Sequence, residues 1–234
     1  LFDDPVTTEL LDQIILEGNY YFVDREKEGR RKQPSPVVIV SKLSNLVNSF
    51  LDNRKKVAIT LGATRAPIDS VRAIQNASSG KTGWAIAEHL FMMGHEVHCI
   101  AGKTSSNPTI ELPNIIRAGS PEEMLSQSLY LAKMDDKPDV WIHSAAVLDY
   151  SMVPEKGKKP SGEDKWEIEL RPTLKHISEL SDLVGDCIRI GFKLETGVSE
   201  EDLIQKSFNQ ISKYGVDYVI ANILEQIGDE NSPR

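Results

Sequence analysis

The segment 78–83 has the composition of a helix start that binds an anion. It reads Ser78-Ser79-Gly80-Lys81-Thr82-Gly83 and comes before an apolar helical pattern. The first N–H groups of a helix have no intrahelical acceptor and lie at its positive dipole end, so they attract phosphate or carboxylate. A plain serine N-cap, with glycines for close packing of the helix on a sheet, explains the same residues without a ligand. The segment alone leaves both interpretations open.

A second candidate segment follows the apolar run Val140-Trp141-Ile142-His143. It reads Ser144-Ala145-Ala146-Val147-Leu148-Asp149-Tyr150. Small residues at the end of a strand allow a flat ligand to lie against the backbone. Asp149 is able to accept a hydrogen bond from a ribose or an amino group. A strand exit with a solvated aspartate is the alternative.

The third candidate is the segment 149–163, which shows no helical or strand pattern. It carries Lys156, Lys158 and Lys159 among glycine and proline residues. Compact domains rarely keep an irregular segment of this length unless it has a function. We therefore expect a mobile basic flap.

Several familiar motifs are absent. A phosphate-binding P-loop ending at Gly80 needs a glycine at position 75, which is Gln75, and the chain contains no Gly-x-Gly for a dinucleotide fingerprint. None of the 6 tyrosines is followed four residues later by lysine, as a short-chain dehydrogenase would require. His95 and His98 are expected on opposite faces of a strand. We therefore predict no protein metal site, and a nicotinamide-dependent oxidoreductase is a weak alternative.

These segments need elements to position them, and from residue 55 strand and helix patterns alternate. Such alternation predicts an α/β fold, a Rossmann-like doubly wound and mostly parallel sheet. Ligands bind beyond the carboxyl ends of the strands in such sheets, which is where the first two segments fall. The predicted strands are 56–61, 96–101, 115–117, 139–143, 188–192 and 218–222; the predicted helices are 81–93, 121–134, 174–183 and 199–213.

Residues 1–54 lack the alternation of strand and helix patterns. We therefore predict two domains: a helical N-terminal extension at 1–54 and a nucleotide-binding domain at 55–234. The extension shows helical apolar spacing at 10–15 and 40–51 and no pattern of a sheet. Ser35-Pro36 is a typical N-cap with proline at the first helical position. The charged stretch 24–33 between the helices is predicted to be an exposed loop. We expect the extension to pack on the main domain.

Composition limits the partners. The chain has 234 residues, a net charge of −8 and no window of 18 consecutive apolar residues. An acidic chain is a poor general binder of nucleic acid, and no transmembrane helix is predicted. The first residues lack the pattern of a signal peptide, and Cys99 and Cys187 lie in apolar runs that do not suggest a disulfide framework. We expect a cytoplasmic protein with no nucleic-acid or membrane partner.

Six blocks, in order, closely resemble the phosphopantothenate–cysteine ligase (phosphopantothenoylcysteine synthetase) family. They are 64–72 (TRAPIDSVR), 76–83 (NASSGKTG), 145–150 (AAVLDY), 154–159 (PEKGKK), 191–196 (GFKLET) and 221–224 (ANIL). Six blocks in family order are far more specific than any one of them. The resemblance implies a ligase of coenzyme A biosynthesis that joins 4′-phosphopantothenate to L-cysteine through an acyl-nucleotide, releasing pyrophosphate and then nucleoside monophosphate.

The resemblance also implies roles for residues. Asn76 supports acyl-nucleotide formation, for which its amide could donate to the acyl oxygen. Lys156 is the flap cation that meets the triphosphate and serves the cysteine half-reaction. The phosphate- and substrate-binding residues are Arg72, Ser78, Ser79, Gly80 and Lys81; those around the nucleotide are His143, Ser144, Ala145, Asp149, Lys156, Pro172, Phe192 and Lys206.

Some points stay open. The family lysine after the block 191–196 matches Lys206 or Lys213, with Lys206 slightly preferred. Blocks 191–196 and 221–224 resemble eukaryotic members, which use ATP, whereas the Ser-Ser-Gly-Lys and Pro-Glu-Lys blocks resemble bacterial members, which use CTP; we favour CTP. Mg²⁺ is expected on the nucleotide phosphates. The family implies a homodimer, the short extension suggests a stand-alone ligase, and the C-terminal end looks truncated. A non-enzymatic nucleotide-binding module is the other alternative.

Overall fold

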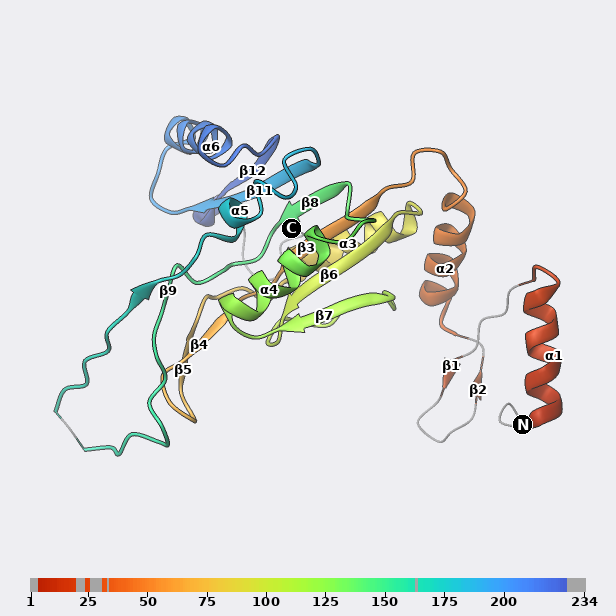
Figure 1. Cartoon of the computed structure of the whole chain (residues 1–234), viewed down its shortest axis with the longest axis horizontal. Coiled ribbons are helices and arrows are strands. Elements are labelled where there is room, and N and C mark those ends of the chain that lie inside the picture. The colour runs from red at the N-terminus through yellow and green to blue at the C-terminus, as the bar shows by residue number, and fades with distance from the viewer. Residues whose placement is uncertain (1–3, 20–23, 26–30, 33, 163, 227–234) are drawn as a thin grey trace.

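The computed structural model describes residues 4–19, 24–25, 31–32, 34–162 and 164–226. Its centre is a six-stranded sheet in which all neighbouring strands are parallel (Figure 1). The helices are α1 (Pro5–Leu16), α2 (Pro36–Asn48), α3 (Lys81–Met92), α4 (Pro121–Ala132), α5 (His176–Glu179), α6 (Glu200–Tyr214) and the 3₁₀ turn η1 (Leu224–Gln226). The strands are β1 (Asp24–Arg25), β2 (Arg31–Lys32), β3 (Lys56–Leu61), β4 (Arg65–Pro67), β5 (Ala73–Gln75), β6 (Glu96–Gly102), β7 (Asn114–Ala118), β8 (Val140–His143), β9 (Tyr150–Ser151), β10 (Arg171–Pro172), β11 (Ile188–Glu195) and β12 (Tyr218–Ile223).

The order of the strands decides where a ligand can bind. Across the sheet the order is β12-β11-β8-β3-β6-β7. In chain order, β6 and β7 are added on one side of β3. The chain then returns to the other side of β3 and adds β8, β11 and β12. Such a reversal opens a crevice at the carboxyl ends of the two central strands, which is the usual ligand site of a doubly wound sheet. The predicted Rossmann-like fold is confirmed.

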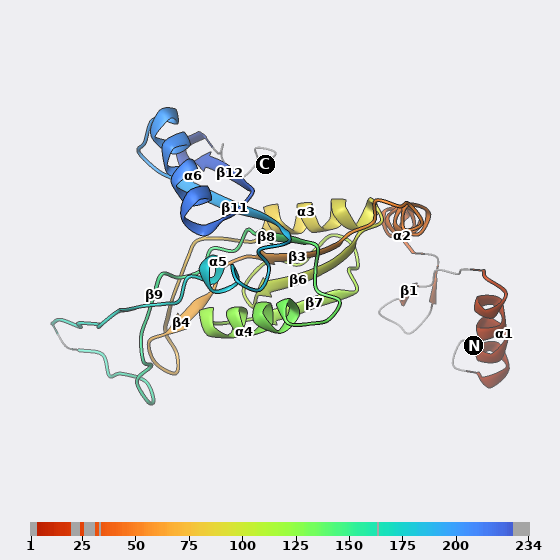
Figure 2. The ribbon, with the colours of Figure 1, turned by 45° about the horizontal axis from the view of Figure 1, so that its top comes forward.

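Helices cover both faces of the sheet. In Figure 2, α3 lies on one side and α4 on the other. One core cluster joins Trp84, Ala87 and Phe91 of α3 to β3 and β6, and the other joins Met124 and Leu131 of α4 to the opposite face. Because the central strands are buried on both faces, their sequences are continuously apolar rather than alternating. β3 shows this pattern as KVAITL.

Most predicted elements of the main domain are confirmed within a few residues. The predicted strand 56–61 coincides with β3, and the helices predicted at 81–93 and 199–213 form α3 and α6. The helix predicted at 174–183 is wrong in extent, because only His176–Glu179 are α-helical and turns follow. Leu180 and Val184, which lie in the segment after α5, are both buried in the core.

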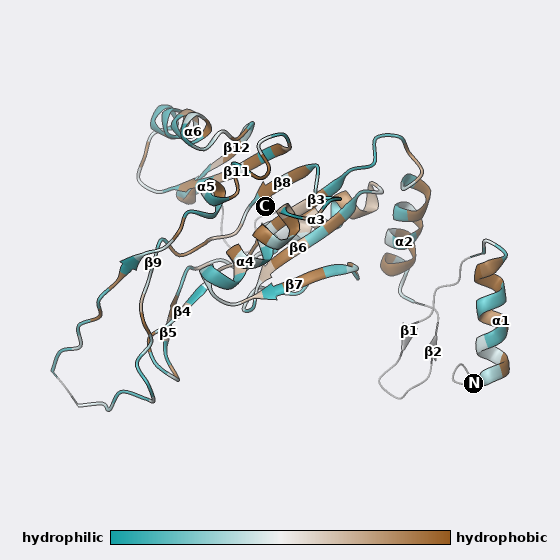
Figure 3. Cartoon of the chain, in the orientation of Figure 1, coloured by the Kyte–Doolittle hydropathy of each residue, from teal (hydrophilic) through white to brown (hydrophobic). Residues whose placement is uncertain are grey.

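The N-terminal region is only partly as predicted. Ser35 Oγ accepts from the amide of Val38 at 3.5 Å, as expected of an N-cap, and Pro36 begins α2. The charged stretch 24–33 contains the antiparallel pair β1–β2, so the expectation of a plain loop is wrong there. α2 packs on α3, but α1 has no buried residue and lies at the far end of the molecule from α6 (Figure 1). Figure 3 shows apolar residues along both helices.

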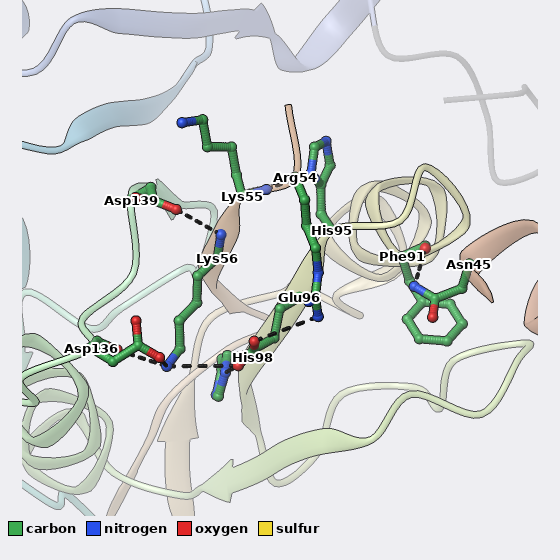
Figure 4. A network of polar contacts seen from close by, with 10 residues as sticks. All are labelled: Asn45, Arg54, Lys55, Lys56, Phe91, His95, Glu96, His98, Asp136 and Asp139. Carbon is green, nitrogen blue, oxygen red and sulfur yellow. Dashed lines mark hydrogen bonds and ion pairs between the residues drawn. The ribbon is translucent and has the colours of Figure 1, made fainter. Parts of the chain in front are cut away.

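The amino ends of the central strands are joined by a polar network (Figure 4). Lys56 Nζ donates to the carbonyl oxygen of Asp136 at 2.7 Å and lies 3.6 Å from Glu96 Oε1. The amide of Lys56 donates to Asp139 Oδ2 at 2.8 Å, and His98 Nε2 lies 2.8 Å from Glu96 Oε1. The hydrogen bond with His98 is the main reason why the pKa of Glu96 lies below its ordinary value, and the charge of Lys56 lowers it further. This network fixes the end of the sheet opposite the crevice.

Candidate functional site

A cavity of about 840 Å³ lies at the carboxyl ends of β3, β8, β11 and β12. The start of α3 forms one wall and one face of α6 forms another. Ten of the residues predicted from the sequence line it: Ser78, Ser79, Gly80, Lys81, His143, Ser144, Ala145, Asp149, Phe192 and Lys206. They come from four separate segments, which the strand order brings to one edge of the sheet.

Gly80, not a serine, is the N-cap of α3. Its φ is +77°, and a Cβ there would lie 3.1 Å from the Cα of Gly62. Gly83, in the first turn, is as tightly packed, since a Cβ would lie 2.4 Å from Leu61 Cβ. The predicted close packing is confirmed, and the plain serine N-cap is wrong because Gly80 occupies the N-cap position, while Ser79 Oγ accepts from the amide of Lys81 at 3.5 Å. The N-cap residue itself offers no side-chain acceptor to the first-turn amides, and the first turn of α3 lines the cavity.

The exit of β8 forms the floor. The side chain of Asp149 forms an ion pair with Lys175, and its carbonyl oxygen accepts from the amide of Thr173 at 2.9 Å. Lys175 therefore contacts the carboxylate of Asp149, which was predicted to accept a hydrogen bond from a ribose or an amino group. Asp149 lines the cavity as expected, and its contact with a ligand stays a prediction.

Two histidines are buried in the wall. Burial lowers the pKa of His143 to about 3 and that of His176, which is 6% exposed, to about 4. Both are therefore neutral at physiological pH. Within the described residues, Nε2 of His143 and Nδ1 of His176 have no hydrogen-bond partner. The wall thus contains two neutral imidazole rings rather than two cations.

Lysines gather around one carboxylate at the end of β11. Glu195 lies 2.7 Å from Lys193 Nζ and 2.6 Å from Lys206 Nζ, and these contacts hold the pKa of Glu195 below its ordinary value. All three residues line the cavity, and so does Lys213. The choice between Lys206 and Lys213 as the nucleotide contact therefore stays open. A cavity bordered by several cations suits a polyanionic ligand.

A buried arginine connects the elements of this wall. Arg189 of β11 is 1% exposed and donates from Nη1 to the carbonyl oxygen of Tyr214 at 2.7 Å. Nη2 donates to the carbonyl oxygen of Ile177 in α5. Because Ile177 and Tyr214 line the cavity, Arg189 fixes the end of α6 and the segment after His176 relative to each other.

Asn76 lies beside the cavity rather than in its lining. Its Nδ2 donates to the carbonyl oxygens of Ala146 at 3.1 Å and Val147 at 3.2 Å. Both of those residues line the cavity, so Asn76 holds its floor in place. The side-chain amide of Asn76 is therefore engaged by these two carbonyl oxygens in this conformation. The predicted donation to an acyl oxygen stays a prediction.

Arg72, Lys156 and Pro172 do not line this cavity. Arg72 pairs with Asp69 and lies over the ring of Trp166, with 4.3 Å from Cζ to the ring centroid. Lys156 is exposed on the basic loop that extends from β9 (Figure 1). Pro172, in β10, lines a smaller cavity beside α4, which shares His176 with the larger one. The structure does not bring these three residues to the lining of this cavity.

Other lining residues were not predicted. They include Thr60, Lys175, His176, Ile177, Lys193, Glu195, Asn209, Gln210, Tyr214 and Asn222. On α6, the lining positions 206, 209, 210, 213 and 214 follow the spacing of one helix face. A periodicity test of the polar residues of this helix would have found that face. No local signal marks the short α5.

Among the described residues, no group of three or more His, Cys, Asp or Glu side chains could hold a metal ion. No helix in this part of the chain is long and apolar enough to cross a membrane. His95 Nδ1 accepts from the amide of Lys55, whereas His98 contacts Glu96. The two histidines thus have separate structural contacts.

The sequence profile of the DNA/pantothenate metabolism flavoprotein C-terminal domain matches residues 53–232. The chain belongs to this family. The family resemblance inferred from the six blocks is confirmed. The profile begins three residues before β3, so the region of α1 and α2 lies outside this flavoprotein C-terminal domain.

Two curated relatives are bifunctional proteins. The chain is 35% identical over 232 residues to the coenzyme A biosynthesis bifunctional protein CoaBC of Thermococcus kodakarensis, covering 99% of this chain and 57% of the relative. It is 31% identical to CoaBC of Methanocaldococcus jannaschii, covering 94% and 54%. The chain thus spans about half the length of these relatives. The first match includes residues before the flavoprotein C-terminal domain.

Solved structures agree with the fold. The DNA/pantothenate metabolism flavoprotein of Streptococcus pneumoniae has a TM-score of 0.67 and 29% identity, covering 75% of this chain and 85% of that one. A Cab2 mutant crystallised with phosphopantothenate-cysteine has a TM-score of 0.62, with 83% and 82% covered. Because its identity is 19%, that likeness concerns the fold alone.

Proposed function

We propose that this chain joins 4′-phosphopantothenate to L-cysteine through an acyl-nucleotide in coenzyme A biosynthesis. Membership of the flavoprotein C-terminal domain family supports the proposal. The observation that carries it is the cavity, where the glycine N-cap of α3 and the cluster of Lys193, Glu195 and Lys206 border the crevice of a doubly wound sheet. Such a site suits a nucleoside triphosphate.

The proposed reaction has two steps. A carboxylate oxygen of phosphopantothenate attacks the α-phosphorus of the nucleotide, and pyrophosphate leaves. The amine of cysteine then attacks the acyl carbon, loses a proton, and displaces nucleoside monophosphate as the amide bond forms. In the first step two anions must meet, so nearby cations lower the barrier by offsetting their repulsion. Lys81, Lys206 and the loop lysine Lys156 are the proposed sources of positive charge.

The nucleotide, the metal and the assembly are part of the proposal. We favour CTP over ATP, with Mg²⁺ on its phosphates, because two of the blocks resemble CTP-dependent members. A homodimer is proposed on the same resemblance, and a cytoplasmic location is proposed on the composition of the sequence. Light scattering of the full chain checks the dimer through the molar mass.

The experiment follows pyrophosphate release from the full chain with phosphopantothenate and Mg²⁺, with and without cysteine, and with CTP or ATP in parallel. We expect release with at least one nucleotide and an amide product only when cysteine is present. No release with either nucleotide would contradict the ligase proposal, and nucleotide binding without release would favour a binding module.

Single variants then separate the two candidate lysines. Lys206→Met and Lys213→Met each remove one cation from the cavity, and Lys133→Met, on the end of α4, serves as a control outside this cavity. If Lys206 is the nucleotide contact, K206M raises the nucleotide KM well beyond the rise in K213M. The reverse ranking would assign the contact to Lys213.

A further inference from the structure

The turn at residues 68–72 and the basic loop at 155–166 are joined by their main chains. The amide of Glu155 donates to the carbonyl oxygen of Ile68 at 2.8 Å, and the amide of Ser70 donates to that of Gly157 at 3.0 Å. These two bonds involve the residues directly before and after Lys156. The backbone at Lys156 is therefore held on both sides by a turn that lies far away in sequence.

A buried carboxylate fixes the same junction. Asp69 is 3% exposed, and its carboxylate accepts from the amides of Val71 and Arg72 at 2.8 Å each and from the amide of Lys159 at 3.2 Å. Arg72 Nε donates to it at 2.9 Å. The hydrogen bond from Arg72, which is the largest cause, holds the pKa of Asp69 well below its ordinary range, and the backbone amides lower it further. Asp69 thus stays charged and connects the turn to the loop.

The guanidinium of Arg72 makes further contacts with the loop. Its Nη2 donates to the carbonyl oxygen of Lys159 at 2.9 Å, and its plane lies over Trp166. Lys159 Nζ lies 5.2 Å from the centroid of the same ring. Two segments separated by 87 residues are therefore connected by hydrogen bonds from Arg72 and to Asp69 at the backbone of Lys159, and by the ring of Trp166.

We propose that Asp69, Arg72 and Trp166 form a dock that sets the position of the loop carrying Lys156, with Asp69 as a positioning residue. Three lysines within four residues repel one another, and an unheld loop would sample many conformations. The dock supplies hydrogen-bond partners for the backbone of the loop and a ring, which together restrict these conformations. The proposal rests on the proposed ligase function only for the chemical role of Lys156.

The experiment compares the full wild-type chain with Asp69→Asn, Trp166→Leu and, as a control, Asp186→Asn. Asp186 pairs with Lys137 outside the loop. D69N removes the charge and keeps the shape, whereas W166L removes the ring and leaves the hydrogen bonds inside the turn unchanged. If D69N does not fold, W166L carries the test. Urea midpoints measured for each variant show which chains are folded.

The first readout needs no activity. Trypsin cleavage after Lys156 and Lys158, identified by mass, reports how firmly the loop is held. We expect D69N and W166L to be cleaved about tenfold faster than wild type and D186N to match it. Cleavage of both folded dock variants at the wild-type rate would overturn the dock.

The second readout connects the dock to Lys156. We expect kcat for pyrophosphate release to fall about 10- to 100-fold in the dock variants while the Kd for nucleotide stays unchanged, because the nucleotide cavity lies elsewhere. An unchanged kcat, or an equal loss of nucleotide affinity, would overturn the positioning role. If the wild-type chain itself releases no pyrophosphate, the ligase proposal fails, yet the trypsin result still decides the dock.

Discussion

At the scale of single residues, several predicted site residues are already engaged by other groups of the protein. Asn76 donates to two carbonyl oxygens, Asp149 pairs with Lys175, and Arg72 pairs with Asp69. These residues were predicted from the sequence motifs. In the structure, their hydrogen-bond and ion-pair partners determine which contacts each can make before a ligand binds. Two of them therefore hold the cavity or the loop in place, whatever further contact they make with a substrate.

Asn76→Asp tests this double role. An aspartate cannot donate and would place a carboxylate against the carbonyl oxygens of Ala146 and Val147, which costs about 1–3 kcal/mol of folding free energy. We expect lower thermal stability and loss of acyl-nucleotide formation, measured as single-turnover pyrophosphate release without cysteine. Asn53→Asp, at an exposed position, is the matched control. Wild-type rates in N76D would remove Asn76 from the site.

His176 makes stability depend on pH. Burial lowers its folded pKa to about 4, below the value of about 6.5 in an unfolded chain. Between these values the unfolded chain binds a proton that the folded chain does not, so stability falls as pH falls through this window. Between pH 6 and 5 we expect His176→Asn to lose about 1 kcal/mol less than wild type in urea unfolding. Ser126→Asn, at an exposed position with no titratable group, should keep the wild-type slope; equal slopes for all three chains would contradict the prediction.

At the scale of elements, the close approach of α3 to β3 sets the geometry of the anion-binding helix start. Gly83 faces Leu61, and Gly80 faces the backbone of Gly62. Neither approach leaves room for a side chain. Close packing therefore explains why glycine is found at both positions, independently of any ligand. The same packing directs the first-turn amides of α3 into the cavity.

Gly83→Ala should move the helix. Its new Cβ would lie 2.4 Å from Leu61 Cβ, and overpacking of this kind costs about 1–3 kcal/mol. We expect a lower urea midpoint together with weaker nucleotide binding, measured by calorimetry. Ala85→Ser, exposed on the same helix, should change both by little. A G83A chain with wild-type stability would show that α3 can shift without cost.

At the scale of the whole molecule, the N-terminal helices relate differently to the core. Asn45 Nδ2 donates to the carbonyl oxygen of Phe91 at 2.7 Å and Asn48 Nδ2 to that of Met92 at 2.8 Å, so α2 is bound to the end of α3. A Cβ on Gly94 would lie 2.3 Å from the backbone of Asn48. α1 has no buried residue. The expected packing of the extension on the main domain is confirmed for α2 and wrong for α1.

Two truncations test this division. Removing residues 1–33 should change Tm by less than about 2 °C, because no buried residue of α1 is lost. Removing residues 1–52 strips α2 from α3 and should lower Tm by about 5 °C or more. Scanning calorimetry at one protein concentration measures both. Equal losses in the two truncations would show that the segment before α2 supports the core.

The distribution of charge also belongs to this scale. A net charge of −8 opposes general binding of polyanions, yet the cavity is bordered by Lys81, Lys193, Lys206 and Lys213. Because a cleft concentrates the potential of the groups that line it, a locally cationic site is compatible with an acidic protein.

The sequence by itself determined the α/β class, the bounds of β3, α3 and α6, the family, and ten residues of the cavity lining. The class and the elements follow from local signals, namely apolar periodicity and short motifs at strand ends, which depend on neighbouring residues. The family and lining residues such as Phe192 and Lys206 follow from the family resemblance. Only the tertiary structure decided the partners. Asn76 and Ala146 are 70 residues apart, and Arg72 and Lys159 are 87 apart, so no local pattern pairs them. The short α5, the dock at Asp69 and the lining face of α6 likewise depend on which segments the sheet brings together, because side-chain contacts follow strand order rather than sequence distance.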